Sequence, residues 1–257
     1  MQLIALTLVF MGTYVFNQIF DIESDRINDK LHFLPRGIIS IKAAWIYYGI
    51  LTLGGLAVGL MESKEAFFIA GGIVALGILY SVPTIRLKDR AVSGLLANSV
   101  AYGLLVPLIL IPERLVHPEI LSTIPYFLAI ATGYVLTTIP DREGDAAFGK
   151  RTVAVVLGVR GALILALLID IATVIVSIKL NNMEMAVVAV TTVVPIVVLL
   201  AHYQHKIMLF TCKFPILLLT LMACYHAPFY FPVLLLTIVL TRVYYKYRFK
   251  ISYPRLR

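Results

Sequence analysis

The chain has 257 residues, of which 60% are hydrophobic and 14% are charged. Soluble domains are roughly 45–50% apolar and about 25% charged, so this composition excludes an ordinary soluble globular protein. The formal net charge of +8 does not indicate nucleic-acid binding, because the basic residues fall in short segments between apolar runs and form no basic face; we predict no nucleic-acid partner.

Apolar runs of membrane-spanning length follow one another along the chain. The hydrocarbon core of a bilayer requires roughly 20 apolar residues per helix. The sequence therefore predicts an all-α fold, a polytopic transmembrane helical bundle of about nine helices in membrane lipid, with a single domain over residues 1–257. The predicted spans cover residues 3–20, 43–61, 66–82, 91–111, 120–139, 161–178, 184–201, 207–225 and 227–245.

Basic residues between the spans predict the orientation of the bundle. The odd-numbered connections and the C-terminal tail contain most of the Lys and Arg residues, whereas the even-numbered connections contain only Lys64, Arg114 and Lys179. Positively charged connections stay on the cytoplasmic side of a membrane. We therefore expect an integral protein of the cell membrane whose odd-numbered connections are cytoplasmic. The same bias favours a break near Ala227, since one merged final helix would place the basic tail outside.

The first predicted span ends in an acidic motif that a later span repeats. Asn17, Asp21 and Asp25 are spaced four residues apart, which places them on one face of a helix with about 6 Å between neighbours. Asp141 and Asp145 have the same spacing at the end of the fifth span, on the same predicted side. Charged groups at membrane depth cost on the order of 3 kcal/mol each, so these clusters indicate a function.

Paired carboxylates can bind a hard cation, and the bound cation can in turn bind an anion. Two like charges a few ångströms apart repel by about 4 kcal/mol at an effective dielectric constant near 20, so acids alone cannot bind a diphosphate. One Mg²⁺ ion at each motif resolves the conflict by bridging carboxylate and phosphate oxygens. The motifs therefore predict two Mg²⁺ ions and a diphosphate ligand. The alternative is a secondary transporter or channel, whose coupling acids are expected near the middle of the membrane.

Three segments, in order, resemble the UbiA-type prenyltransferase superfamily. They read N-Q-I-F-D-I-E-S-D from Asn17, Y-S-V-P-T-I-R-L-K from Tyr80 and D-R-E-G-D-A-A-F-G-K-R-T-V-A-V-V-L-G from Asp141. The resemblance implies a helical bundle around a central cavity, and Mg²⁺-dependent transfer of a prenyl chain from an isoprenyl diphosphate to a lipophilic acceptor. The catalytic set that it implies is Asp21, Asp25, Asp141, Asp145 and Lys88. The Mg²⁺ ligands are Asn17 and these four aspartates, and the diphosphate contacts are Asn17, Tyr80, Arg86, Lys88, Lys150, Arg151 and, in the first connection, Arg36.

Aromatic residues near the motifs are expected to shield a prenyl carbocation with their π-faces, or else only to pack helices. The candidates are Tyr14, Phe16, Tyr102 and Tyr134. Asp170 lies within the sixth span at the expected depth of Lys213, which predicts a structural ion pair between them. The acceptor stays open at this point: an aromatic ring, a haem edge, a chlorin alcohol or a prenylated glycerol phosphate.

Overall fold

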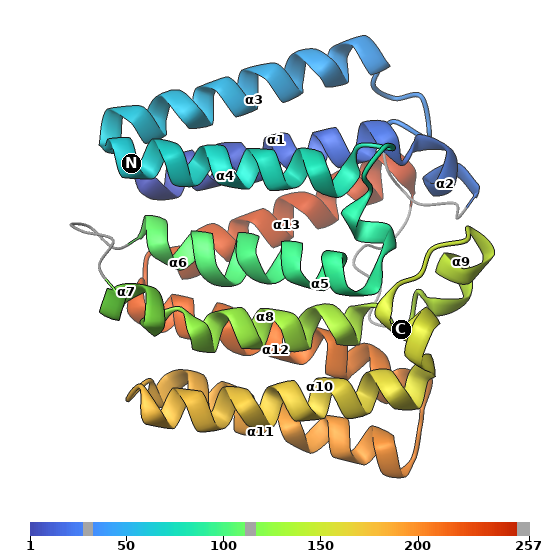
Figure 1. Ribbon diagram of the computed structural model, residues 1–257. Helices are drawn as coiled ribbons and strands as arrows, with labels where there is room; N and C mark the ends of the chain where they lie inside the picture. The colour runs from blue at the N-terminus through green and yellow to red at the C-terminus, as the bar shows by residue number, and fades with distance from the viewer. Residues whose placement is uncertain (28–32, 111–116, 251–257) are drawn as a thin grey trace.

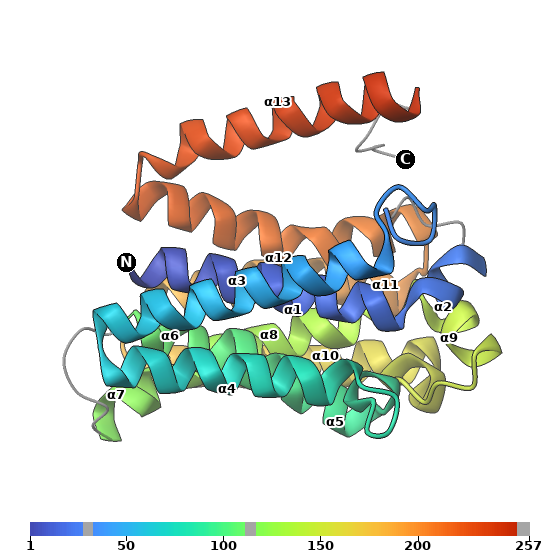
Figure 2. The same ribbon diagram turned by 90° about the horizontal axis from the view of Figure 1, so that it is seen from above.

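The computed structural model describes residues 1–27, 33–110 and 117–250, and all regular secondary structure in these ranges is helical. The long helices run along a common direction and pack side by side (Figures 1 and 2). The elements are α1 (Gln2–Phe20), α2 (Ile22–Ile27), α3 (Ile41–Glu62), α4 (Lys64–Ser81), the 3₁₀ turn η1 (Leu87–Asp89), α5 (Ala91–Asn98), the π-helix η2 (Ser99–Leu105), α6 (Val106–Ile109), α7 (His117–Ser122), α8 (Ile124–Thr137), α9 (Arg142–Ala147), α10 (Val153–Lys179), α11 (Met183–Ala201), α12 (His205–His226) and α13 (Tyr230–Phe249).

Eight of the described helical spans are long and apolar enough to cross a membrane, and each overlaps one of the first eight predicted spans. The ninth predicted span needs correction. Its residues form the helix α13, but the second half of α13 carries Arg242, Lys246 and Arg248, and the helix is less apolar than the others. The expected break near Ala227 is confirmed, because α12 ends at His226 and α13 runs back in the opposite direction (Figure 2).

Small residues allow α3 and α4 to pack closely against α1. A Cβ atom on Gly55 of α3 would lie 2.7 Å from the side chain of Val9, and one on Gly77 of α4 would lie 2.5 Å from that of Thr13. Glycine at these two positions therefore permits an approach that larger residues would prevent. The contacts fix the position of α1, whose last turn carries Asn17.

A second group of helices, α8, α10, α11 and α12, packs around a core that includes Leu136, Leu163 and Met208. α10 begins at Val153 rather than at the predicted residue 161. The difference arises at Gly158, where a positive φ of 70° interrupts the helical path. The regular apolar pattern of a straight helix resumes only beyond this kink.

The fourth predicted span is not one regular helix. Its middle third is the π-helix Ser99–Leu105, between α5 and α6. Pi-helical turns are rare and often lie at functional sites. Gly103 of this segment packs against the backbone of α8, where an added Cβ would lie 2.7 Å from the Phe127 nitrogen and 2.8 Å from the Tyr126 oxygen.

The substitution Gly103→Ala is expected to destabilise the protein by about 1–3 kcal/mol, because backbone atoms must move to admit the methyl group. The measurement is the thermal unfolding midpoint of the purified protein in detergent. Gly71→Ala is the matched control, since nothing lies within 4 Å of its Cβ position. Alanine there is expected to leave the midpoint unchanged or to raise it. Equal midpoints for the two variants would contradict the close packing of the π-helix on α8.

The predicted ion pair between Asp170 and Lys213 is wrong. Asp170 is 2% exposed, and its Oδ2 atom has no hydrogen-bond partner among the residues that the structure describes. Lys213 is exposed on α12, and no salt bridge joins the two side chains. Rise per residue predicts only depth in the membrane, whereas pairing also requires that two side chains face each other around their helix axes.

Candidate active site

The predicted functional segments meet at one end of the bundle. α2, which carries Asp25, and α9, which carries Asp145, lie side by side there in both views, and the connection between α4 and α5 reaches the same end (Figures 1 and 2). Segments far apart in the sequence therefore surround one region. This arrangement agrees with the expectation that the three motifs share one side of the membrane.

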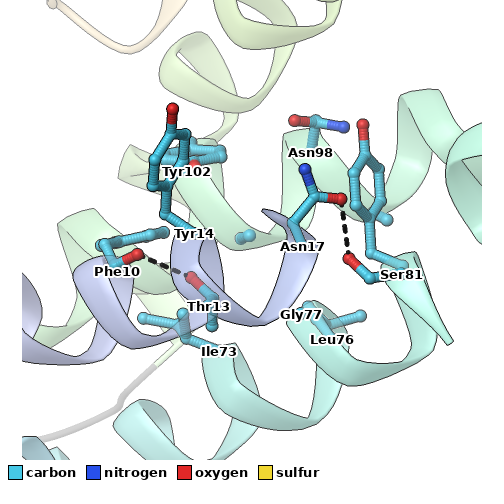
Figure 3. Close-up of a pocket in the computed structure, with 13 residues that line it drawn as sticks. Phe10, Thr13, Tyr14, Asn17, Ile73, Leu76, Gly77, Ser81, Asn98 and Tyr102 are labelled. Carbon is cyan, nitrogen blue, oxygen red and sulfur yellow. Dashed lines mark hydrogen bonds between the residues drawn. The ribbon is translucent and has the colours of Figure 1, made fainter. Parts of the chain in front are cut away.

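Lys88 lies at the centre of the first motif. Its Nζ atom donates hydrogen bonds to Asn17 Oδ1 at 2.7 Å and to the two carboxylate oxygens of Asp21 at 2.6 and 2.7 Å. The Ser81 hydroxyl donates to the same Asn17 oxygen at 3.0 Å (Figure 3). The Lys88 side chain is 9% exposed and that of Asp21 is 15% exposed. Resemblance to the family implied Lys88 as a site residue, but no sequence pattern indicated its contact with Asp21 or the role of Ser81.

The helical stripe that was expected through Asn17, Asp21 and Asp25 is interrupted. α1 ends at Phe20, Asp21 is its C-terminal cap, and the short helix α2 begins at Ile22. The backbone N–H of Asp25 still donates to the Asp21 carbonyl at 2.8 Å, so the two acids remain one turn apart. Asp25 is 1% exposed, so its side chain is buried within the protein.

The segment between α4 and α5 places a second cation beside Asp21. Arg86 has a left-handed backbone with φ of 44°, which is strained for a residue other than glycine. Its guanidinium lies 3.5 Å from Asp21 Oδ1. Its Nε atom is 3.0 Å from Asp89 Oδ2 but is not aligned for a hydrogen bond. The turn therefore directs both Arg86 and Lys88 towards the first motif.

The second motif is joined to the Lys88 segment through the backbone. Arg90 and Arg151 form an isolated parallel β-bridge, and the Arg151 N–H donates to the Asp89 carbonyl at 2.7 Å. Lys150 lies 3.0 Å from Asp145 Oδ1. Asp141 is the exposed N-terminal cap of α9. No sequence pattern predicts this bridge, because it joins two single residues that lie 61 positions apart in the chain (151 minus 90).

An apolar cavity of about 130 Å³ extends from the first motif into the bundle, and we call it the site cavity (Figure 3). Its polar end contains Asn17, Ser81, Tyr80 and Asn98, and the Asn98 amide nitrogen donates a hydrogen bond to the Gly94 carbonyl at 2.9 Å. The deeper wall includes Phe10 and Tyr102. The predicted cavity is therefore found beside the first motif.

The aromatic candidates have different surroundings. Tyr14 and Tyr102 line the site cavity. Phe16 instead packs against Trp45 and Tyr48 between α1 and α3, with ring centroids 5.8 and 4.9 Å away, so it packs helices. Tyr14 also lines a cavity of about 270 Å³ that reaches Tyr245 of α13, and we call it the lateral cavity. In the first connection, the Arg36 guanidinium lies 5.6 Å from the centre of the Phe249 ring, and its contact with a diphosphate stays a prediction.

Burial lowers the pKa of the Lys88 ammonium, and the charge and hydrogen bond of Asp21 oppose that shift. A buried ammonium is thus maintained by one carboxylate at contact distance. If Asp21 is engaged elsewhere, Lys88 loses this stabilisation and requires another anion.

The first motif has the ligand chemistry of a Mg²⁺ site. Three oxygen atoms, one from Asn17 and two from Asp21, converge on the Lys88 ammonium, which takes the place of a bound cation. Carboxylate and amide oxygens are the ligands that Mg²⁺ and Ca²⁺ prefer. Within the described ranges, no three His, Cys, Asp or Glu side chains lie close enough together to bind a metal. The motifs therefore offer small, separate sets of ligands and not one acidic cage.

A model of the UbiA prenyltransferase family matches residues 1–208, which include both acidic motifs and the Lys88 segment. The chain belongs to this family. The expectation drawn from the three segments is therefore confirmed at the level of the family.

Two relatives carry the same name, digeranylgeranylglyceryl phosphate synthase. The protein from Methanoculleus marisnigri is 32% identical over 160 residues, which are 61% of this chain and 56% of the relative. The protein from Pyrococcus abyssi is 32% identical over 183 residues, 67% of this chain and 64% of the relative. The matched region thus spans less than two thirds of the length of these curated relatives.

Solved UbiA homologues have the same fold. The homologue from Archaeoglobus fulgidus, bound to DMAPP and Mg²⁺, has a TM-score of 0.66 at 20% identity, with 84% of this chain and 85% of that chain covered. The apo homologue from Aeropyrum pernix K1 has a TM-score of 0.66 at 18% identity, with 84% and 85% covered. The predicted all-helical membrane bundle is therefore confirmed.

Proposed function

We propose that the protein transfers a prenyl chain from an isoprenyl diphosphate to a lipophilic acceptor within the membrane, in a Mg²⁺-dependent reaction. The observation that carries this proposal is the Asn17, Asp21 and Lys88 cluster at the polar end of an apolar cavity. A prenyl diphosphate has the same two halves, a charged head and an apolar chain. Solved homologues from A. fulgidus bind DMAPP or GPP together with Mg²⁺.

The proposed metal ligands are Asn17, Asp21 and Asp25 for one ion and Asp141 and Asp145 for the other. Two bound Mg²⁺ ions supply positive charge that stabilises the diphosphate as a leaving group. The cations of the chain complete the binding of phosphate oxygens; they are Lys88, Arg86, Lys150, Arg151 and Arg36, with Tyr80 as a neutral hydrogen-bond donor. Lys88 is central among them, because it is buried and already positioned by Asp21.

The reaction forms a bond between an acceptor atom and C1 of the prenyl chain, and it breaks the bond between C1 and the diphosphate oxygen. The diphosphate leaves with the electron pair, and the acceptor loses a proton. Tyr14 lines the same cavity as Asn17, where its π-face stabilises positive charge on the prenyl chain. The apolar walls exclude water, which would otherwise capture the cation.

The acceptor that we propose is a prenylated glycerol phosphate. Both relatives reported above are named digeranylgeranylglyceryl phosphate synthase. The lateral cavity offers a second apolar space beside Tyr14, through which a lipid acceptor reaches the site cavity from the membrane. Lys and Arg residues flank the ends of the helices near the motifs, which supports a cytoplasmic location of the site in the cell membrane. No feature of the site favours the transporter or channel alternative.

Purified protein in lipid nanodiscs tests the proposal. The reaction contains Mg²⁺, geranylgeranyl diphosphate and either geranylgeranylglyceryl phosphate or 4-hydroxybenzoate, and the readouts are diphosphate release and product mass. We expect a product with the glycerol phosphate acceptor only, and no product when EDTA removes Mg²⁺. Transfer to 4-hydroxybenzoate and not to the glycerol phosphate would show that the acceptor is an aromatic ring and would contradict the proposed acceptor. The absence of any prenylated product would refute the proposed function.

A further inference from the structure

Two cavities of the bundle share one side chain. Tyr102 lines the site cavity, and it also lines a larger apolar cavity of about 400 Å³ that we call the deep cavity. The deep cavity lies beyond η2, and its walls include Pro107, Tyr126 and Met185. The site cavity contains Asn17 of the charged motif, and the deep cavity lies between α6, α8 and α11, so Tyr102 is the lining residue that the two spaces share.

The Tyr102 ring is held in place by a second ring. It stacks on Phe10 of α1 with centroids 4.6 Å apart and planes inclined by 14°. Stacked aromatic pairs contribute roughly 0.5–1.5 kcal/mol beyond the burial of their area. Figure 3 shows the two side chains together at the end of the cavity away from Asn17 and Ser81. The pair therefore forms the inner wall of the site cavity.

The backbone around Tyr102 is firmly packed, whereas its side chain is not. Gly103 contacts the backbone of α8 so closely that no Cβ atom fits. The Tyr102 side chain is 47% exposed, although the residue lies within a membrane span, and it lines both cavities. Connection of the cavities therefore requires rotation of a side chain and no movement of a helix.

The size of the site cavity limits what it can contain. Its volume of about 130 Å³ is below the roughly 300–1,000 Å³ of ordinary ligand pockets. A short prenyl chain ends at the Tyr102 ring, whereas a long chain has to continue into the deep cavity. Tyr102 is the one lining residue that the site cavity and the deep cavity have in common among the described residues.

We propose that Tyr102, supported by Phe10, determines the length of the prenyl chain that the protein accepts. This inference rests on the proposed prenyl transfer. In the stacked position the ring closes the site cavity and favours short chains. When the ring turns away from Phe10, the two cavities join and a long chain passes into the deep cavity. Tyr102 is thus a specificity-determining residue, and its effect is on the choice between chain lengths.

The test compares kcat/KM for geranylgeranyl diphosphate with kcat/KM for geranyl diphosphate in wild type and variants. Tyr102→Ala is expected to raise this ratio at least about tenfold, since differences of a few methylene groups in an apolar pocket reach this size. Tyr102→Phe keeps the ring and is expected to keep the ratio. Phe10→Ala releases the ring and is expected to raise the ratio by less. Because the readout is the ratio of the two kcat/KM values, any effect of Tyr102 that is equal for the two prenyl diphosphates cancels.

Tyr225→Ala is the matched control, because Tyr225 lies on α12, is 79% exposed and lines neither cavity. If Tyr102→Ala does not fold, Tyr102→Leu removes the ring while retaining an apolar side chain. Transfer by the wild type with an unchanged ratio in the folded Tyr102 variant would overturn this inference alone. No transfer of either chain by the wild type would overturn the proposed function as well, so the two failures are distinguishable.

Discussion

Asp21→Asn is expected to lower the rate of prenyl transfer roughly 10²–10³-fold, the loss seen when one preorganised electrostatic partner of a reaction is removed. Asp21 supplies two of the three oxygens that surround the Lys88 ammonium, and its side chain is only 15% exposed. Asparagine has the same shape but no charge. The variant therefore retains the packing of the site while losing a ligand for Mg²⁺ and the partner of Lys88.

Two measurements separate this effect from misfolding. The first is diphosphate release under saturating Mg²⁺, and the second is the rise in unfolding midpoint caused by Mg²⁺ together with geranyl diphosphate. Both are expected to be lost in Asp21→Asn, and the midpoint without ligands is expected to fall, because the buried Lys88 ammonium loses its carboxylate partner. Glu23→Gln is the matched control, because Glu23 belongs to the same segment and is exposed. Equal behaviour of the two variants would show that Asp21 does not bind the metal or the substrate.

The sequence predicted most of the bundle because its two signals are local. The length of apolar runs locates helices in a membrane, and the distribution of basic residues locates their connections. Spacing by four residues similarly indicated Asp21 and Asp145, since residues one helical turn apart share a face whatever the tertiary structure. These signals failed where local geometry departs from a straight helix: at Gly158, at Asp21 and in the π-helix Ser99–Leu105.

Contacts between distant segments were not predictable in the same way. The Lys88 ammonium lies between Asn17 and Asp21 because a strained turn at Arg86 and the packing of α4 on α1 bring it there. Neither residue identity nor spacing encodes that distance. The predicted pairing of Asp170 with Lys213 was wrong for the same reason, because the sequence indicates the depth of each residue in the membrane but not the direction of its side chain around the helix axis. A single helix determines the spacing of its own side chains, whereas the packing of neighbouring helices determines which side chains meet.

Lys88→Met is expected to lower prenyl transfer roughly 10²–10³-fold while leaving Mg²⁺ binding intact or stronger. The ammonium occupies the point on which the oxygens of Asn17 and Asp21 converge, so it competes with a metal ion for them. Methionine removes this competitor and also removes the charge that binds the diphosphate. Lys88→Met is thus expected to maintain or strengthen Mg²⁺ binding and to weaken diphosphate binding. Asp21→Asn is instead expected to weaken the binding of both. Titration of the unfolding midpoint with Mg²⁺ alone reports the first effect, and diphosphate release reports the second.

The pH dependence provides a further test of Lys88. Burial lowers its pKa, so the wild type is expected to lose activity as the pH rises through a value below that of an exposed lysine. Deprotonation removes the same charge that Lys88→Met removes, and the residual activity of that variant is therefore expected to lack this alkaline decline. Lys88→Arg retains a charge that does not titrate in this range, so this variant too is expected to lack the alkaline decline. Its rate of prenyl transfer is expected to be lower than that of the wild type, because a guanidinium fits less well between Asn17 and Asp21. An identical decline in all three proteins would assign the titration to another group and leave Lys88 as a structural counter-ion of Asp21.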